Sequence, residues 1–102
     1  MDLVRVCSFT AGIITPRNPA EYTRIVVTFA QDGKTIITKN KSDLALQEDG
    51  VKIRLTQAET ALFKAPGVAL MQLRAYKSEY DAPGSKCWAL DVYPALNEEI
   101  LS

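Results

Sequence analysis

Hydrophobic and polar residues alternate along much of the chain, and this pattern predicts strands. Val51, Ile53 and Leu55 alternate with Lys52 and Arg54, which is the period of two expected of a strand with one buried face. Similar short runs, rich in β-branched residues and bounded by Gly, Pro or Asp, recur along the sequence. They predict about eight strands, near residues 3–7, 9–15, 22–30, 34–39, 44–48, 51–55, 68–76 and 86–93.

Two Asp-Gly pairs predict tight hairpins. Asp32-Gly33 separates 22–30 from 34–39, and Asp49-Gly50 separates 44–48 from 51–55. Asp-Gly readily adopts the positive φ angles of a type I′ turn, which joins neighbouring antiparallel strands. The sequence therefore predicts that each of these strand pairs is antiparallel.

One helical turn is expected near residues 57–63. Thr56-Gln57-Ala58-Glu59 has the pattern of a capping box, in which the Thr hydroxyl and the Glu carboxylate each accept a hydrogen bond from the other residue's amide. Pro66-Gly67 then prevents the helix from continuing. We expect Leu62 and Phe63, at the end of this turn, to close the bottom of the core.

The passage from strand 51–55 through this turn to strand 68–76 is typical of the corner where an immunoglobulin-like sandwich changes sheets. We therefore predict an all-β, immunoglobulin-like antiparallel β-sandwich, with a small barrel as the alternative. One sheet is expected to hold 3–7, 9–15, 44–48 and 51–55, and the other 22–30, 34–39, 68–76 and 86–93. The length of 102 residues predicts a single domain, 1–102.

The second predicted sheet has one face that is more apolar than a solvated face should be. Every second residue along its strands is suited to the core. These residues are Ile25, Val27, Phe29, Met71, Leu73, Trp88, Leu90 and Val92. The residues between them, on the opposite face of the sheet, include aliphatic and aromatic residues with one Arg. This mixture is enriched at protein–protein contacts. We expect an interface at Val26, Leu70, Gln72, Arg74, Tyr76, Ala89, Asp91 and Tyr93.

Two points about this face stay open in the sequence. Arg74 is expected either to pair with Asp91 or to lie at a wet rim, because an unpaired buried charge is costly. The face itself has a plainer interpretation as an ordinary, moderately apolar surface, covered by the last residues of the chain or by nothing.

Composition narrows the possible chemistry. Twelve Lys and Arg balance twelve Asp and Glu, and no basic patch stands out, so no nucleic-acid partner is expected. The absence of His excludes Ser-His-Asp and Cys-His catalysis. No phosphate-binding loop or metal-ligand spacing is present, so we predict a protein that is not an enzyme, with no catalytic residue, metal, cofactor or small-molecule substrate.

The cysteines and the apolar runs indicate in which cellular compartment the protein is expected. Cys7 and Cys87 are expected to be reduced, buried residues on strands, and a disulfide between a first and a last strand is the alternative. The run Val68–Met71 is too short to span a membrane, and the first residues lack the pattern of a signal peptide. We therefore expect no membrane partner and a cytoplasmic location, with exit by a route that does not use a signal of its own as the alternative.

Sugar binding is the alternative function. Tyr22, Tyr76, Tyr80 and Tyr93, together with Trp88, suggest a stacking platform for a carbohydrate-binding or adhesin-like module, but the parity of Trp88 favours the core. A further cluster, Lys34, Lys39 and Lys41, is interpreted as a charged hairpin rim that discourages edge pairing.

Three segments carry a resemblance to a known group of proteins: Thr28–Lys39, Arg54–Phe63 and Met71–Arg74, which read TFAQDGKTIITK, RLTQAETALF and MQLR. They resemble short structural proteins of phages and prophages of gut-type bacteria and, more distantly, the N-terminal β-sandwich of phage upper-baseplate proteins. Those phage proteins lack cysteines corresponding to Cys7 and Cys87, and their loop corresponding to 77–85 is shorter.

The resemblance implies a structural protein associated with a virion, tail or baseplate. Its partners would be copies of itself or other phage structural proteins. It would be located in the bacterial cytoplasm before assembly and then in the virion. No catalytic residue comes with the resemblance.

Overall fold

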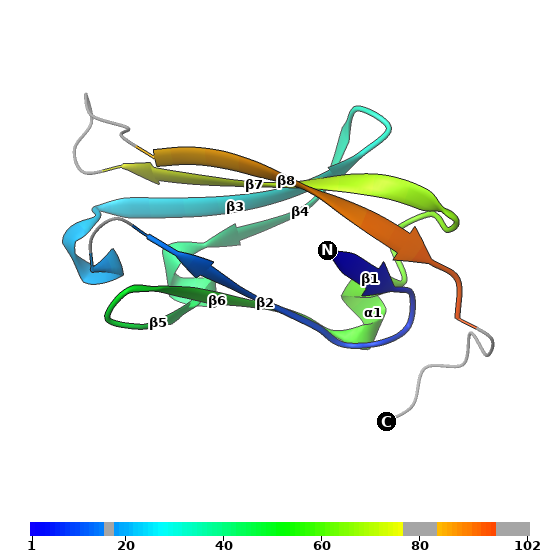
Figure 1. Ribbon diagram of the computed structural model, residues 1–102, viewed down its shortest axis with the longest axis horizontal. Helices are drawn as coiled ribbons and strands as arrows, with labels where there is room; N and C mark the ends of the chain where they lie inside the picture. The colour runs from blue at the N-terminus through cyan, green and yellow to red at the C-terminus, as the bar shows by residue number, and fades with distance from the viewer. Residues whose placement is uncertain (16–17, 77–83, 96–102) are drawn as a thin grey trace.

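Two β-sheets packed face to face form the protein in the computed structural model, which describes residues 1–15, 18–76 and 84–95 (Figure 1). The larger sheet has the strand order β1-β8-β7-β3-β4, and the smaller has β2-β6-β5. The strands are β1 (Asp2–Val4), β2 (Phe9–Ile14), β3 (Arg24–Gln31), β4 (Lys34–Asn40), β5 (Ala45–Leu46), β6 (Gly50–Leu55), β7 (Gly67–Tyr76) and β8 (Gly84–Tyr93). The short helices are η1 (Pro19–Glu21), η2 (Lys41–Asp43) and α1 (Gln57–Thr60). The described strands thus form the predicted sandwich and not the alternative barrel.

The first strand lies in the other sheet from the one predicted. β1 ends at Val4 and pairs in parallel with β8, with Asp2 opposite Asp91 and Val4 opposite Tyr93. The prediction of a strand over 3–7 in the same sheet as 9–15 was therefore wrong. The chain turns at Val6, whose φ is 65°, a left-handed conformation that is uncommon for a β-branched residue. After this turn the chain crosses to the smaller sheet as β2.

The β3–β4 hairpin has the predicted turn. Asp32 and Gly33 have φ angles of 54° and 77°, as a type I′ turn requires. The strands are antiparallel, with a shift of register between Phe29 and Ala30.

The second Asp-Gly pair joins antiparallel strands by a different geometry. β5 is only two residues long, and Gly50 is the first residue of β6, with no positive φ. The loop closes with a hydrogen bond from the Gln47 amide to the Gly50 carbonyl at 2.8 Å. Gly50 is needed for a different reason, because a Cβ there would overlap the carbonyl oxygen of Ile13 on β2.

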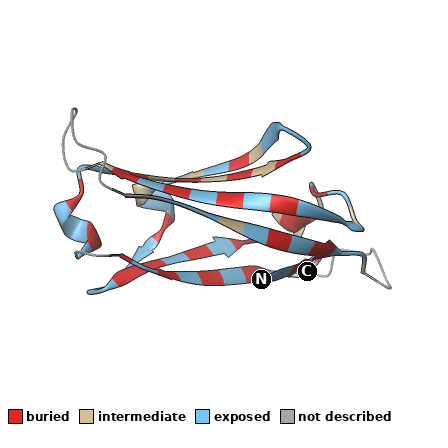
Figure 2. Ribbon diagram, turned by 45° about the horizontal axis from the view of Figure 1, so that its top comes forward, coloured by how far each residue is buried: buried red, intermediate tan, exposed pale blue. Residues whose placement is uncertain are grey.

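The core lies between the sheets and has three phenylalanines at one end. Phe29 on β3 makes edge-to-face contacts with Phe9 on β2, at 6.4 Å between ring centroids, and with Phe63 after α1, at 6.2 Å. Phe63 is buried as predicted, whereas its neighbour Leu62 is 59% exposed, so the prediction for Leu62 was wrong. Buried residues alternate with exposed ones along β2 and most of β7, and with half-buried ones along most of β3 (Figure 2).

The predicted core of the larger sheet is confirmed with one exception. Trp88 is only half-buried and packs against the edge of the core. The buried residues of this set are Ile25, Val27, Phe29, Met71, Leu73, Leu90 and Val92.

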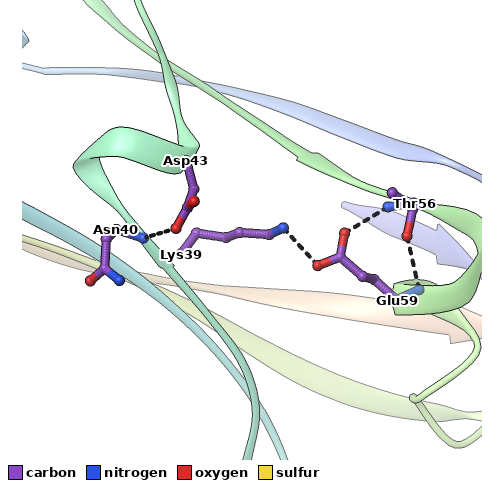
Figure 3. A network of polar contacts seen from close by, with 5 residues as sticks. All are labelled: Lys39, Asn40, Asp43, Thr56 and Glu59. Atoms are coloured by element: carbon purple, nitrogen blue, oxygen red, sulfur yellow. Dashed lines mark hydrogen bonds and ion pairs between the residues drawn. The ribbon is translucent and has the colours of Figure 1, made fainter.

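The capping box before α1 is confirmed and is connected to the larger sheet (Figure 3). The Glu59 amide donates to Thr56 Oγ1 at 3.2 Å, and the Thr56 amide donates to Glu59 Oε1 at 2.9 Å. The second carboxylate oxygen lies 2.6 Å from Lys39 Nζ on β4. Lys39 thus links the edge of the larger sheet to the start of α1.

The predicted rim of three lysines is not formed. Lys39 points toward Glu59, and Lys41 donates from Nζ to the carbonyl of Tyr22 at 2.6 Å. Lys34 is exposed at the hairpin. The three side chains therefore serve different parts of the fold.

Stability should depend on pH through Glu59. Burial alone raises the pKa of this carboxyl group, but the hydrogen bond from Lys39, the Thr56 amide and the Lys39 charge together lower it below 4.5. The carboxylate therefore stabilises the fold fully above that pH, and the stabilisation is lost as the pH falls through the lowered pKa. We expect Glu59→Gln to reduce the free energy of unfolding near neutral pH and to have much less effect at about pH 3.

Urea titrations at the two pH values measure this difference. Glu48→Gln is the matched control, because Glu48 is an exposed carboxylate in the β5–β6 loop. A loss of stability in Glu59→Gln that is equal at both pH values would contradict the assignment.

Candidate protein-association face

All eight predicted interface residues lie on the outward side of the larger sheet. The register alternates inward and outward residues, so that Val26 lies opposite Arg74 and Leu70 lies opposite Ala89 on this one face. Six of them are exposed and two, Val26 and Tyr76, are half-buried. The exposed members are Leu70, Gln72, Arg74, Ala89, Asp91 and Tyr93.

One end of this face carries large exposed hydrophobic side chains from three adjacent strands. Val4 on β1 lies opposite Tyr93 on β8, and Val68 and Leu70 follow on β7. Their exposed fractions are 37% for Val4, 48% for Tyr93, 55% for Val68 and 49% for Leu70. We call these four residues, together with Ala89, the apolar patch.

Two members of the apolar patch, Val4 and Val68, were not predicted from the sequence. Val68 has the same parity as Leu70, so the alternation along β7 was a signal that could have identified it. Val4 could not be found in that way, because β1 was assigned to the other sheet. Asp91 lies within the patch, opposite Val68.

The other end of the face is cationic and aromatic. The guanidinium groups of Arg24 and Arg74 lie 5.7 Å and 5.4 Å from the centre of the Tyr76 ring, within the range of cation–π contacts. Arg74 lies in register with Ser85, whereas Asp91 lies in register with Val68, well along the strand. The structure thus shows Arg74 exposed beside Tyr76 and does not bring it to Asp91.

The proposed sugar-stacking platform is not assembled by the described residues. Tyr22 is 3% exposed, and Trp88 faces the core side of the sheet. Tyr76 and Tyr93 lie at opposite ends of the β7–β8 ladder. Tyr80 lies outside the described residues.

Both cysteines differ from the expectation of burial. Cys7 and Cys87 are free and exposed, and Cys7 lies after the turn at Val6, outside any strand. Cys87 lies on β8, opposite Gln72. The alternative of a disulfide between them is not formed either.

Residues 1–15, 18–76 and 84–95 contain Asp, Glu and Cys side chains, which are candidate metal ligands. No group of three or more His, Cys, Asp or Glu is placed to hold a metal ion among these residues. A surface hollow of about 420 Å³ is lined by Ser8, Arg54, Leu55, Thr56 and Gln57. No described helix is long and apolar enough to cross a bilayer.

Comparisons with known proteins identify the fold. No family model matches the chain, and no curated protein matches it significantly. A solved strand-swapped dimer of the immunoglobulin-like domain of mouse leukocyte-associated immunoglobulin-like receptor 1 matches with a TM-score of 0.54 and 13% identity. That match covers 90% of this chain and 85% of the other.

Two further solved structures also match the chain. The extracellular domain of the mouse receptor, also a strand-swapped dimer, matches with a TM-score of 0.50 and 12% identity over 99% of this chain and 86% of that one. A putative glycoside hydrolase from Bacteroides vulgatus matches with a TM-score of 0.50 and 15% identity over 92% of this chain, but only 16% of the hydrolase. At these identities the likeness shows the fold alone. The chain folds as an immunoglobulin-like β-sandwich, as the sequence predicted.

Proposed function

We propose that this protein is a non-enzymatic structural module that acts by protein–protein association through the outer face of its larger sheet. The observation that carries the proposal is the apolar patch. Its four large side chains are between 37% and 55% exposed and come from adjacent strands. Burying such a surface contributes about 25 cal/mol per Å² before the cost of association.

The outer face of the smaller sheet provides an internal comparison. There β6 presents Lys52 and Arg54, opposite Gly12 and Thr10 of β2, and Ile14 at the end of β2 is the exposed hydrophobic exception. This is the composition of a solvated sheet face. The two outer faces of the same domain therefore differ, and the larger sheet presents the one suited to a partner.

Self-association is the simplest form of the proposal. The mouse receptor domains that share this fold were solved as strand-swapped dimers, which supports a second copy as one partner. The resemblance of the segments 28–39, 54–63 and 71–74 to phage proteins supports a role in a virion, tail or baseplate assembly. Neighbouring genes test that role: portal, capsid or tail genes would support it, and a metabolic operon would contradict it.

A charge placed in the apolar patch should weaken association. Leu70 is half-exposed in the patch, so Leu70→Glu should leave the monomer folded but make burial of the patch costly. We expect the dimer dissociation constant to rise at least about tenfold, measured by sedimentation equilibrium or light scattering over a range of concentrations.

Thr10→Glu is the matched control, because Thr10 is exposed on the outer face of the smaller sheet. It should leave the dissociation constant unchanged. A wild-type protein that stays monomeric at high concentration would contradict self-association, and equal effects of the two variants would contradict the choice of face.

A further inference from the structure

Strand β8 has an open edge along most of its length. On one side it pairs with β7 from Gly84 to Val92. On the other side it pairs with β1 only from Asp91 to Tyr93. Among the residues that the structure describes, no strand lies beside 84–90 on that side (Figure 1).

The backbone groups that point to this open edge can be assigned. The Asp91 amide donates to the Met1 carbonyl at 2.9 Å, and the Tyr93 carbonyl accepts from the Arg5 amide at 3.0 Å. Along a strand, the N–H and C=O groups of successive residues point alternately to one side and the other. The β7–β8 register runs without a shift. The N–H and C=O groups of Ser85, Cys87 and Ala89 therefore point to the same side and face the open edge.

We propose that a second copy of this chain pairs with this edge, β8 to β8 in antiparallel orientation, about a two-fold axis at Cys87. The inference goes beyond the proposed function, because pairing at the β8 edge is a second contact that leaves the outward apolar patch of both copies exposed. β1 already occupies the edge from Asp91 onward, so the usable groups are those of Ser85, Cys87 and Ala89. A two-fold pairing that uses all of them places Cys87 opposite the partner's Cys87, and Ser85 opposite the partner's Ala89.

The same register also gives complementary side chains. Lys86 would lie opposite the partner's Trp88, and Trp88 opposite the partner's Lys86. Lys86 is exposed and Trp88 is half-buried, so the ammonium group can approach the ring in a cation–π contact. On the outward side, Ala89 of each apolar patch would lie opposite the partner's Ser85, beside the cationic and aromatic end of the partner's face.

The other edges are less suited to this pairing. β4 carries Lys39, turned inward to Glu59, and borders the shift of register at Phe29, and both features discourage edge pairing. β5 is two residues long, and β2 has Gly12 at the middle of its edge, which weakens a strand. The β8 edge has no shift of register against β7. It also carries one inward-facing charge, Lys86, but in the proposed register this residue lies opposite the partner's Trp88.

Oxidation of Cys87 gives a direct test of the register. Hydrogen-bonded residues in an antiparallel pair have Cα atoms about 5.5 Å apart, within the range for a disulfide. The oxidant is diamide, which accepts two electrons and two protons from two thiols as the S–S bond forms. Cys7→Ser, which keeps Cys87, should form a covalent dimer on a non-reducing gel at least about tenfold faster than Cys87→Ser, which keeps the exposed Cys7.

A third variant controls for random collision. Cys7→Ser/Cys87→Ser/Ala89→Cys moves the thiol two residues along the same outward face. In the proposed register its two thiols would lie four residues apart along the strands, about 13 Å, so it should cross-link only as slowly as Cys87→Ser. Equal rates for Cys7→Ser and for this triple variant would overturn the proposed register.

The outcomes separate this inference from the proposed function. If wild-type protein dimerises and Leu70→Glu abolishes the dimer, but Cys87 cross-links no faster than Cys7, the face is used and the β8 edge is not. If the wild type is monomeric and Cys87 does not cross-link preferentially, self-association and edge pairing both fail. Preferential cross-linking at Cys87, with no reaction above background in the triple variant that carries Ala89→Cys, supports the inference.

Discussion

Replacing Phe63 by alanine should lower the free energy of unfolding by about 3–5 kcal/mol. Phe63 is 1% exposed, and its ring makes an edge-to-face contact with Phe29 at 6.2 Å. Truncation would leave a cavity beneath Phe29, where the two sheets and the segment after α1 meet. Urea or thermal unfolding of the purified variant measures the change.

The adjacent residue is a matched control. Leu62 has a large apolar side chain in the same segment but is 59% exposed, so Leu62→Ala should change stability by no more than about 0.5 kcal/mol. Similar losses of stability in Phe63→Ala and Leu62→Ala would contradict the orientation in which Phe63 points into the core and Leu62 points to solvent.

Gly50→Ala should also be strongly destabilising, by about 1–3 kcal/mol or more. An added Cβ would overlap the carbonyl oxygen of Ile13, and it would approach Ile13 C at 3.1 Å and Ile14 Cα at 3.2 Å. These are backbone atoms of β2, so β2 and β6 would have to separate. A lower urea midpoint, with native-like circular dichroism in buffer, is the expected result.

Gly12→Ala provides the comparison, since a Cβ at Gly12 meets nothing within 4 Å. Gly12 has no positive φ, and Ala restricts the unfolded chain more than Gly does. Its effect should therefore be neutral or slightly stabilising, by about 0.4–1 kcal/mol. A loss of stability in Gly12→Ala as large as that in Gly50→Ala would show that glycine is required for strand flexibility and not for close approach.

The features that sequence predicted well depend on a few neighbouring residues. The turn at Asp32-Gly33 and the capping box of Thr56 and Glu59 are set within four residues, and both are confirmed. Alternation also identified which side of β7 and β8 faces outward, because a strand that is buried on one side leaves only one choice of parity.

The features that sequence could not supply depend on distant partners. Leu3 suits the core from either sheet, so its pattern did not show that β1 pairs with β8. The positive φ of Val6, which ends the strand, has no local signature in a β-branched residue. The ion pair between Lys39 and Glu59 joins a strand of the larger sheet, β4, to the helical turn α1, which lies far from it in the sequence.

The candidate site shows the same division. Parity placed eight residues on one face, but it could not show that this face has an apolar end and a cationic end. That division follows from register, which puts Arg74 beside Ser85 and Tyr93 beside Val4. Val4 joined the patch only once the pairing of β1 was known.

The position of Met1 has a practical consequence for recombinant work. Its carbonyl accepts a hydrogen bond from Asp91, so any peptide fused ahead of it would start in the slot beside residues 84–90. A short β-prone extension could dock there in cis and occupy the place of an incoming strand. Affinity tags placed at this terminus would then hide pairing of two copies at the β8 edge. An extension designed to occupy that edge would serve as a tethered competitor of this pairing.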